Sequence, residues 1–143
     1  MKRLFSWILV ALQFGLLIVL MANMSFSCWW CIGLYVVSGS LGMWAVVVMK
    51  LGNFNIVPDV KHDSILVTEL PYKHIRHPMY TSVILLGLGM MLSAYSSFTL
   101  LIWLGLVVIM FMKAKYEESL LMARFPDYEK YCANTKAFIP FVL

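Results

Sequence analysis

The segment from Tyr72 to Tyr80 holds the densest group of side chains that could do chemistry. Arg76 and His77 are followed at once by Pro78. Proline suits the first turn of a helix, where free N–H groups and the positive end of the helix dipole attract anions. Arg76 beside such a turn predicts a site for a carboxylate or another anion. A basic segment that contacts lipid headgroups is an equally compatible interpretation.

Glu117 and Glu118 form a second group. Adjacent helical residues point about 100° apart, so we expect only one of them to face a given ligand. If their helix lies beside the helix that begins near Pro78, then Arg76, His77 and one glutamate converge at the membrane boundary. Ionisable groups that meet there indicate a functional site. The alternative is surface charge pairing, for example between Lys113 and Glu117 four residues later.

Cys28 and Cys31 have the C-x-x-C spacing of a redox couple. The third cysteine, Cys132, is expected on the opposite side of the membrane, so no second pair is available to relay electrons. Cysteines are also common as small buried hydrophobic residues. A thiol-based or non-catalytic membrane protein is therefore the minor alternative.

Gly87 and Gly89 lie two positions apart in the helix that follows Pro78. Small residues in membrane helices usually mark close packing between helices. Packing is the favoured interpretation, and Gly89 is also kept as a position where a ligand could approach the backbone.

The charge distribution predicts the elements that must position these groups. The chain has 143 residues, of which 62% are hydrophobic and 13% charged, whereas about 25% of a soluble domain is charged. No charged residue occurs from Leu4 to Met49 or from His77 to Met112, and each block fits two crossings of about 20 residues. We therefore predict a single all-α domain, a polytopic membrane protein with helices near 4–22, 28–49, 79–95 and 98–124.

The same distribution predicts an orientation. All 11 Lys and Arg and all 7 Asp and Glu fall in segments 1–3, 50–78 and 113–143. By the positive-inside rule these segments and both termini are cytoplasmic, in the plasma membrane if the source is prokaryotic. The first helix is expected to be retained, because its apolar run exceeds that of a cleaved signal. Nucleic-acid binding is not expected, since no basic cluster is interleaved with exposed aromatic residues.

Beyond the last long helix, a cytoplasmic tail over 125–143 completes the chain. Pro126 suits the first turn of a short helix, on which Tyr128 and Tyr131 share one face. Pro140 then stops the chain near its end.

Taken in order, these residues resemble the isoprenylcysteine carboxyl methyltransferase and phospholipid methyltransferase group of integral membrane enzymes. The resemblance covers roughly residues 54–141. Its elements are Pro71-Tyr72, Arg76-His77-Pro78-Met79-Tyr80, Glu117-Glu118 and an aromatic tail with Phe125, Tyr128, Tyr131 and Ile139-Pro140. Three positions depart from the usual pattern, because each holds another residue where the family usually has a glycine. These residues are Leu70, Ser82 and Pro126, which follows Phe125.

The resemblance implies S-adenosylmethionine as the cofactor and no metal. The cofactor carboxylate would suit Arg76, His77 and the first N–H groups after Pro78. Its ammonium or ribose hydroxyls would suit Glu117 or Glu118, and its sulfonium an aromatic face from Tyr80 or Tyr128. The implied catalytic residues are Arg76, His77 and Glu118. The implied cofactor-binding residues are Tyr72, His77, Pro78, Tyr80, Gly89, Glu117, Glu118 and Tyr128.

The implied acceptor is lipid-like or embedded in the membrane, and it reaches the site from the bilayer. A carboxylate of the prenylcysteine kind would need no general base, whereas an amine headgroup would need one, such as His77 or a glutamate. A membrane reductase of the sterol type, which uses NADPH and has a similar tyrosine and Ile-Pro tail, is the main alternative.

Overall fold

The computed structural model describes residues 2–25, 28–53 and 66–139. Within these ranges the chain forms five helices: α1 (Lys2–Asn23), α2 (Cys31–Asn53), α3 (Pro78–Ser93), α4 (Ser97–Arg124) and α5 (Tyr128–Asn134). The all-α prediction is confirmed. Part of the predicted 50–78 connection, residues 54–65, and Pro140 of the predicted tail lie outside the described residues.

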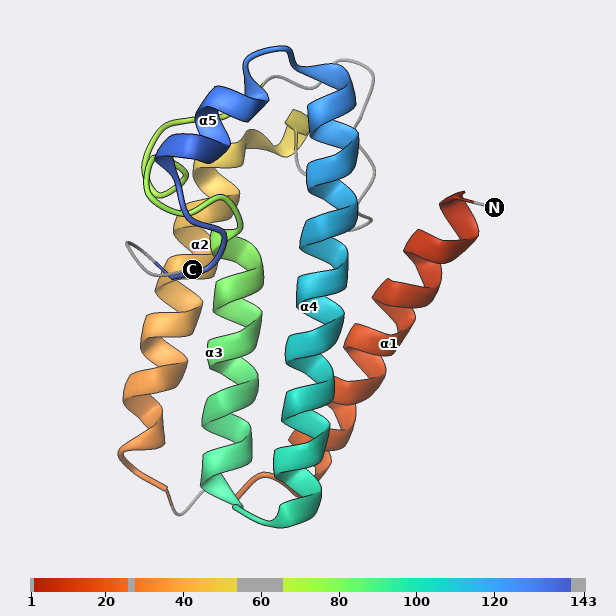
Figure 1. Ribbon diagram of the computed structural model, residues 1–143. Coiled ribbons are helices and arrows are strands. Elements are labelled where there is room, and N and C mark those ends of the chain that lie inside the picture. The colour runs from red at the N-terminus through yellow and green to blue at the C-terminus, as the bar shows by residue number, and fades with distance from the viewer. Residues whose placement is uncertain (1, 26–27, 54–65, 140–143) are drawn as a thin grey trace.

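Three of the described helices, α1, α2 and α4, are long and apolar enough to cross a membrane. The fourth apolar helix, α3, has 16 residues and is therefore about 24 Å long, shorter than a hydrocarbon core of about 30 Å. It lies between α2 and α4, and α1 packs against α4 (Figure 1). The chain is a multi-pass membrane protein.

Helix boundaries follow local chemistry. Pro78 begins α3 as predicted to within one residue. Ser96 caps α4 through reciprocal hydrogen bonds with Thr99, which satisfy free N–H groups of the first turn.

The predicted start of the second helix at Cys28 is wrong. α2 begins at Cys31, because residues 28–30 form a turn across which Cys28 and Cys31 are joined by a disulfide. The interpretation of this pair as two free buried thiols is therefore also wrong.

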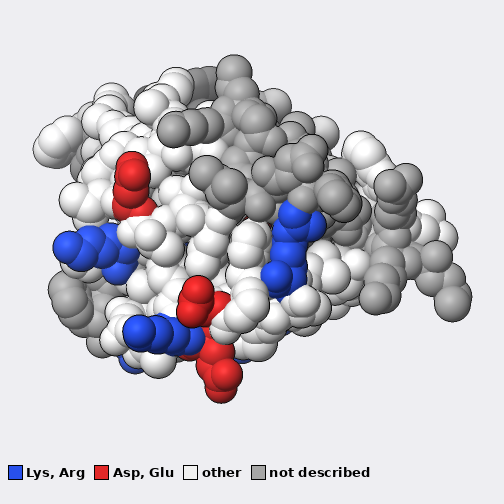
Figure 2. Space-filling model, turned by 90° about the horizontal axis from the view of Figure 1, so that it is seen from above, with Lys and Arg blue, Asp and Glu red and all other residues white. Residues whose placement is uncertain are grey.

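The charged residues gather at one end of the bundle. The start of α3, the end of α4 and α5 all lie there (Figure 1). Figure 2 looks onto this end, where lysine, arginine, aspartate and glutamate side chains appear together. The tail folds back into the bundle, so that Phe138 joins a buried apolar cluster with Leu20, Met91, Leu106, Met110 and Ala114.

Gly89 permits the close packing of α3 on α2. A Cβ atom built there would lie 2.6 Å from Cε1 of Tyr35. We expect Gly89→Ala to destabilise the protein by about 1–3 kcal/mol, because the ring must move. Gly105→Ala is the matched control, since its Cβ would meet Leu16 at an ordinary 3.8 Å. Thermal unfolding in nanodiscs measures both, and equal midpoints for the two variants would contradict the packing role.

Candidate active site

A cluster of ionisable side chains joins the start of α3 to α4. Nε of Arg76 lies 2.8 Å from Oε1 of Glu118, and Nε2 of His77 lies 3.2 Å from the same oxygen. The side chains of Arg76, His77 and Glu118 are only 13%, 4% and 8% exposed. Charged groups are rarely buried to this degree unless they are paired. The mutual pairing of these three side chains is therefore what permits their burial.

Arg76 also anchors the tail. Its Nη1 donates to the carbonyl oxygens of Cys132, at 3.2 Å, and Thr135, at 2.5 Å. Burial acts to lower the pKa of the Arg76 guanidinium, but the hydrogen bond and charge of Glu118 outweigh it, and the net pKa is raised. Arg76 is therefore a permanent cation held by α4, by α5 and by the residue that follows α5.

The backbone of this segment pairs with the tail. The N–H of Arg76 donates to the carbonyl of Lys136 at 2.7 Å, and the N–H of His77 donates to that of Ala137 at 3.0 Å. The N–H of Lys136 donates back to His74 at 3.2 Å, which completes a parallel bridge between Ile75 and Lys136. Two chain segments far apart in sequence thus fix the position of His77.

Glu117 lies near Nδ1, the other ring nitrogen of His77. Its Oε2 accepts a hydrogen bond of 2.7 Å from the Tyr80 hydroxyl and lies 3.8 Å from Nδ1 of His77. Its side chain is 27% exposed, against 8% for Glu118. Both glutamates therefore reach the segment, although only one was expected to do so. Their angular separation on α4 leaves Glu118 inside the cluster and Glu117 accessible at its edge.

A buried lysine extends the cluster toward α1. Nζ of Lys113 donates to Oε1 of Gln13 at 2.6 Å and lies 5.1 Å from the centroid of the Tyr80 ring. Gln13 was not among the site residues predicted from the sequence. The sequence does indicate a role for it, because a glutamine within a long uncharged membrane helix needs a polar partner.

Buried tyrosines frame the cluster. The hydroxyl of Tyr131 donates to the carbonyl of Tyr72 at 2.6 Å, and the hydroxyl of Tyr72 donates to that of Ala45 in α2 at 3.3 Å. Tyr128 is 1% exposed, with its ring centroid 5.7 Å from that of Tyr131. Burial raises the pKa of the Tyr72, Tyr128 and Tyr131 hydroxyls far above the usual range, so these groups stay neutral.

Among the sequence-predicted residues, Gly89 is the one that the structure does not bring to the cluster. It lies roughly 16 Å along α3 from Pro78 and packs against Tyr35. Pro78 is buried at the start of α3, directly after His77.

An open groove of about 510 Å³ lies next to the cluster. It is lined by Leu66, Thr68, Lys73, Asp127, Lys130, Tyr131, Asn134 and Thr135. Thr135 also accepts a hydrogen bond from Arg76, so this residue belongs to both the groove and the cluster. The volume lies within the usual range for small-molecule sites.

Phe138 was also missed by the sequence-based site. It is 4% exposed, and its ring centroid lies 4.4 Å from Phe111 and 5.8 Å from His77. No helical periodicity marks it, because it follows α5 in irregular chain. The feature of the sequence that indicates a buried aromatic residue here is the aromatic composition of the tail.

Comparison with known proteins adds one finding. The family model described as phospholipid methyltransferase matches residues 29–127, which include α2, α3, α4 and the Arg76–Glu118 cluster. No curated protein matches the chain. The resemblance found in the sequence is thereby confirmed, and members of this family use S-adenosylmethionine to transfer methyl groups. The chain belongs to the phospholipid methyltransferase family and is a membrane methyltransferase that uses S-adenosylmethionine.

Proposed function

We propose that the chain methylates the amine headgroup of a membrane lipid, with His77 as the proton acceptor. The observation that carries this proposal is the position of His77 between the two glutamates. Glu118 pairs with Arg76 and, as a carboxylate, only accepts hydrogen bonds, so the hydrogen of a neutral His77 resides on Nε2. Nδ1 is then left as an acceptor, on the side of Glu117.

The residues present fit S-adenosylmethionine. The cofactor is an amino acid with a cationic sulfonium and an adenosine, so carboxylate and aromatic partners suit it. Glu117, which remains partly exposed, suits the ammonium or the ribose hydroxyls. The Tyr80 ring, whose centroid lies 5.3 Å from that of His77, already has the Lys113 ammonium 5.1 Å from its centroid and is an aromatic group of the kind that stabilises a cation. Tyr131 and Thr135 in the adjoining groove suit the nucleoside.

When bound, S-adenosylmethionine supplies an electrophilic methyl group. The chain's own residues then have three tasks. Arg76 and Glu118 hold the His77 ring in one orientation. The buried tyrosines and the tail exclude water from it. Nδ1 of His77 takes a proton from an ammonium acceptor, whose nitrogen must be neutral before it can accept a methyl group.

The charge of the site favours an amine over a carboxylate acceptor. Glu117 is the partly exposed carboxylate beside Nδ1 of His77, and it attracts an ammonium and repels a carboxylate. The exposed Lys115 lies 3.7 Å from Oε2 of Glu118, so its charge is paired with the other glutamate. The family description, phospholipid methyltransferase, points to the same class of acceptor. A lipid headgroup also suits a site at the charged end of apolar helices, where headgroups lie.

We also propose that this charged end faces the cytoplasm, in the plasma membrane if the source is prokaryotic. The confinement of all lysines and arginines to three segments supports this orientation. Both termini would then be cytoplasmic.

Methyl transfer from radiolabelled S-adenosylmethionine tests the acceptor. In nanodiscs, we expect label in phosphatidylethanolamine and none in a prenylcysteine carboxylate. His77→Asn should lower the rate by about a hundred-fold or more, because the proton acceptor is lost. The matched control is His74→Asn, which alters an exposed histidine of the same segment and should keep most of the rate. Label in the carboxylate acceptor alone would contradict the proposal.

A further inference from the structure

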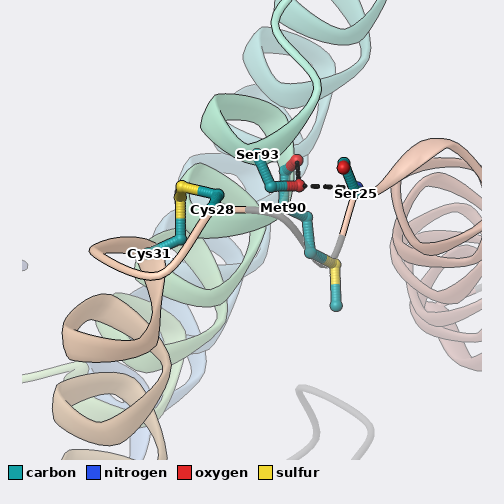
Figure 3. The surroundings of a disulfide bond; sticks show 5 residues. All are labelled: Ser25, Cys28, Cys31, Met90 and Ser93. Carbon is teal, nitrogen blue, oxygen red and sulfur yellow. Dashed lines mark hydrogen bonds between the residues drawn. A yellow bond between two sulfur atoms is a disulfide. The ribbon is translucent and has the colours of Figure 1, made fainter.

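The Cys28–Cys31 disulfide is at the start of α2, which lies at the end of the bundle opposite α5 and the start of α3 (Figure 1). Figure 3 shows its surroundings. Cys31 is the first residue of α2 and is 0% exposed, whereas Cys28 precedes the helix and is partly exposed. The methyltransferase function proposed above uses neither sulfur.

The position of this bond argues against a purely structural role. It joins residues only 3 positions apart, and the restraint that a disulfide places on the unfolded chain is smallest for short loops. The turn is also held without it, since the N–H of Cys31 donates to Cys28 at 3.2 Å and that of Ile32 to Trp29 at 3.2 Å.

The segment before the disulfide is joined to α3 by a hydrogen bond of its own. The N–H of Ser25 donates to Oγ of Ser93 at 3.1 Å, and that hydroxyl donates to the carbonyl of Met90 at 2.7 Å (Figure 3). Opening the disulfide would leave these hydrogen bonds in place.

The two sulfurs differ in the way that thiol exchange requires. An incoming thiolate can reach Cys28, and the sulfur that leaves, on Cys31, lies in the first turn of α2. The positive end of the dipole of that helix stabilises a thiolate. Trp29 and Trp30, between the cysteines, are 78% and 53% exposed and offer an apolar surface beside the reactive bond.

We infer that Cys28 and Cys31 form a thiol-exchange site that is reduced by an external dithiol. A thiolate of the dithiol attacks Sγ of Cys28, the S–S bond breaks, and Cys31 leaves as a thiolate that takes a proton from water. The second thiol of the reductant, as a thiolate, then attacks its own sulfur in the mixed disulfide and releases Cys28. Two electrons pass to the protein, and the dithiol becomes a disulfide.

The experiment uses the full chain in nanodiscs, with Cys132→Ser to remove the third thiol. Dithiothreitol at about 1 mM is added, samples are quenched with acid, and free thiols are counted with a maleimide. We expect reduction of the folded protein within minutes. With Cys31→Ser the remaining thiol should label at least about ten-fold faster than with Cys28→Ser, because Cys31 is buried.

Thermal unfolding before and after reduction separates exchange from structural support. We expect the midpoint to stay within about 2 °C, because the neighbouring hydrogen bonds persist. Three results would overturn the inference: reduction only after denaturation, equal labelling of the two single cysteines, or a larger fall in the midpoint on reduction.

Discussion

Glu118→Gln should lower the affinity for S-adenosylhomocysteine by about a hundred-fold or more, which is about 2.7 kcal/mol. Glu118 positions both Arg76 and His77 through one oxygen, so the neutral amide weakens the hold on two groups of the proposed cofactor site together. It also leaves the Arg76 charge uncompensated in a nearly buried place, which should destabilise the fold by about 3 kcal/mol. Calorimetry of the folded fraction, with thermal unfolding, measures both effects.

Glu117→Gln is the matched control for this prediction. The two glutamates are adjacent, but Glu117 is more exposed and accepts its hydrogen bond from the neutral Tyr80 hydroxyl. We expect a stability loss of about 1 kcal/mol or less. If the two variants lost equal stability, the cluster around Glu118 would not be the structural centre of the site.

Phe138→Ala should give the second large effect, a destabilisation of about 3–5 kcal/mol. The ring is 4% exposed and packs on Phe111 and His77. Its loss opens a cavity under the tail whose backbone holds Arg76 and His77. We therefore also expect affinity for S-adenosylhomocysteine to fall by about ten-fold or more, because site geometry loosens.

Ile139→Ala provides the control for Phe138. It changes the neighbouring residue, which is 51% exposed, and should alter stability by less than about 0.5 kcal/mol. A Phe138→Ala variant with unchanged unfolding and unchanged affinity would show that the tail does not support the site.

Much of the fold could be predicted from the positions of charged residues. The uncharged blocks predict the apolar helices because a charge in a bilayer is expensive, and Pro78 predicts the start of α3 because proline fits a first turn. The start of α2 could not be predicted, because a disulfide and a turn displace it to Cys31. Neither leaves a periodic signal in the sequence.

The site was predictable where it depends on adjacent helices. Arg76, His77 and the glutamates follow from the ends of α3 and α4 lying side by side. The contributions of Thr135, Phe138 and Gln13 depend on a tail that folds back and on the pairing of α1 with α4. These are long-range contacts, and neither composition nor helical spacing specifies them. Packing was the favoured interpretation of Gly89, and its close approach to Tyr35 agrees with it, whereas a role in cofactor binding stays a prediction.

Isothermal titration of the wild-type protein with S-adenosylhomocysteine, and separately with NADPH, determines which of the two cofactors the folded chain binds. The cluster of Arg76, His77 and Glu118 beside the groove is proposed to hold the methyl donor. We predict saturable binding of S-adenosylhomocysteine and no heat of binding with NADPH. A folded protein that binds NADPH and gives no signal with S-adenosylhomocysteine would contradict this account and favour a membrane reductase.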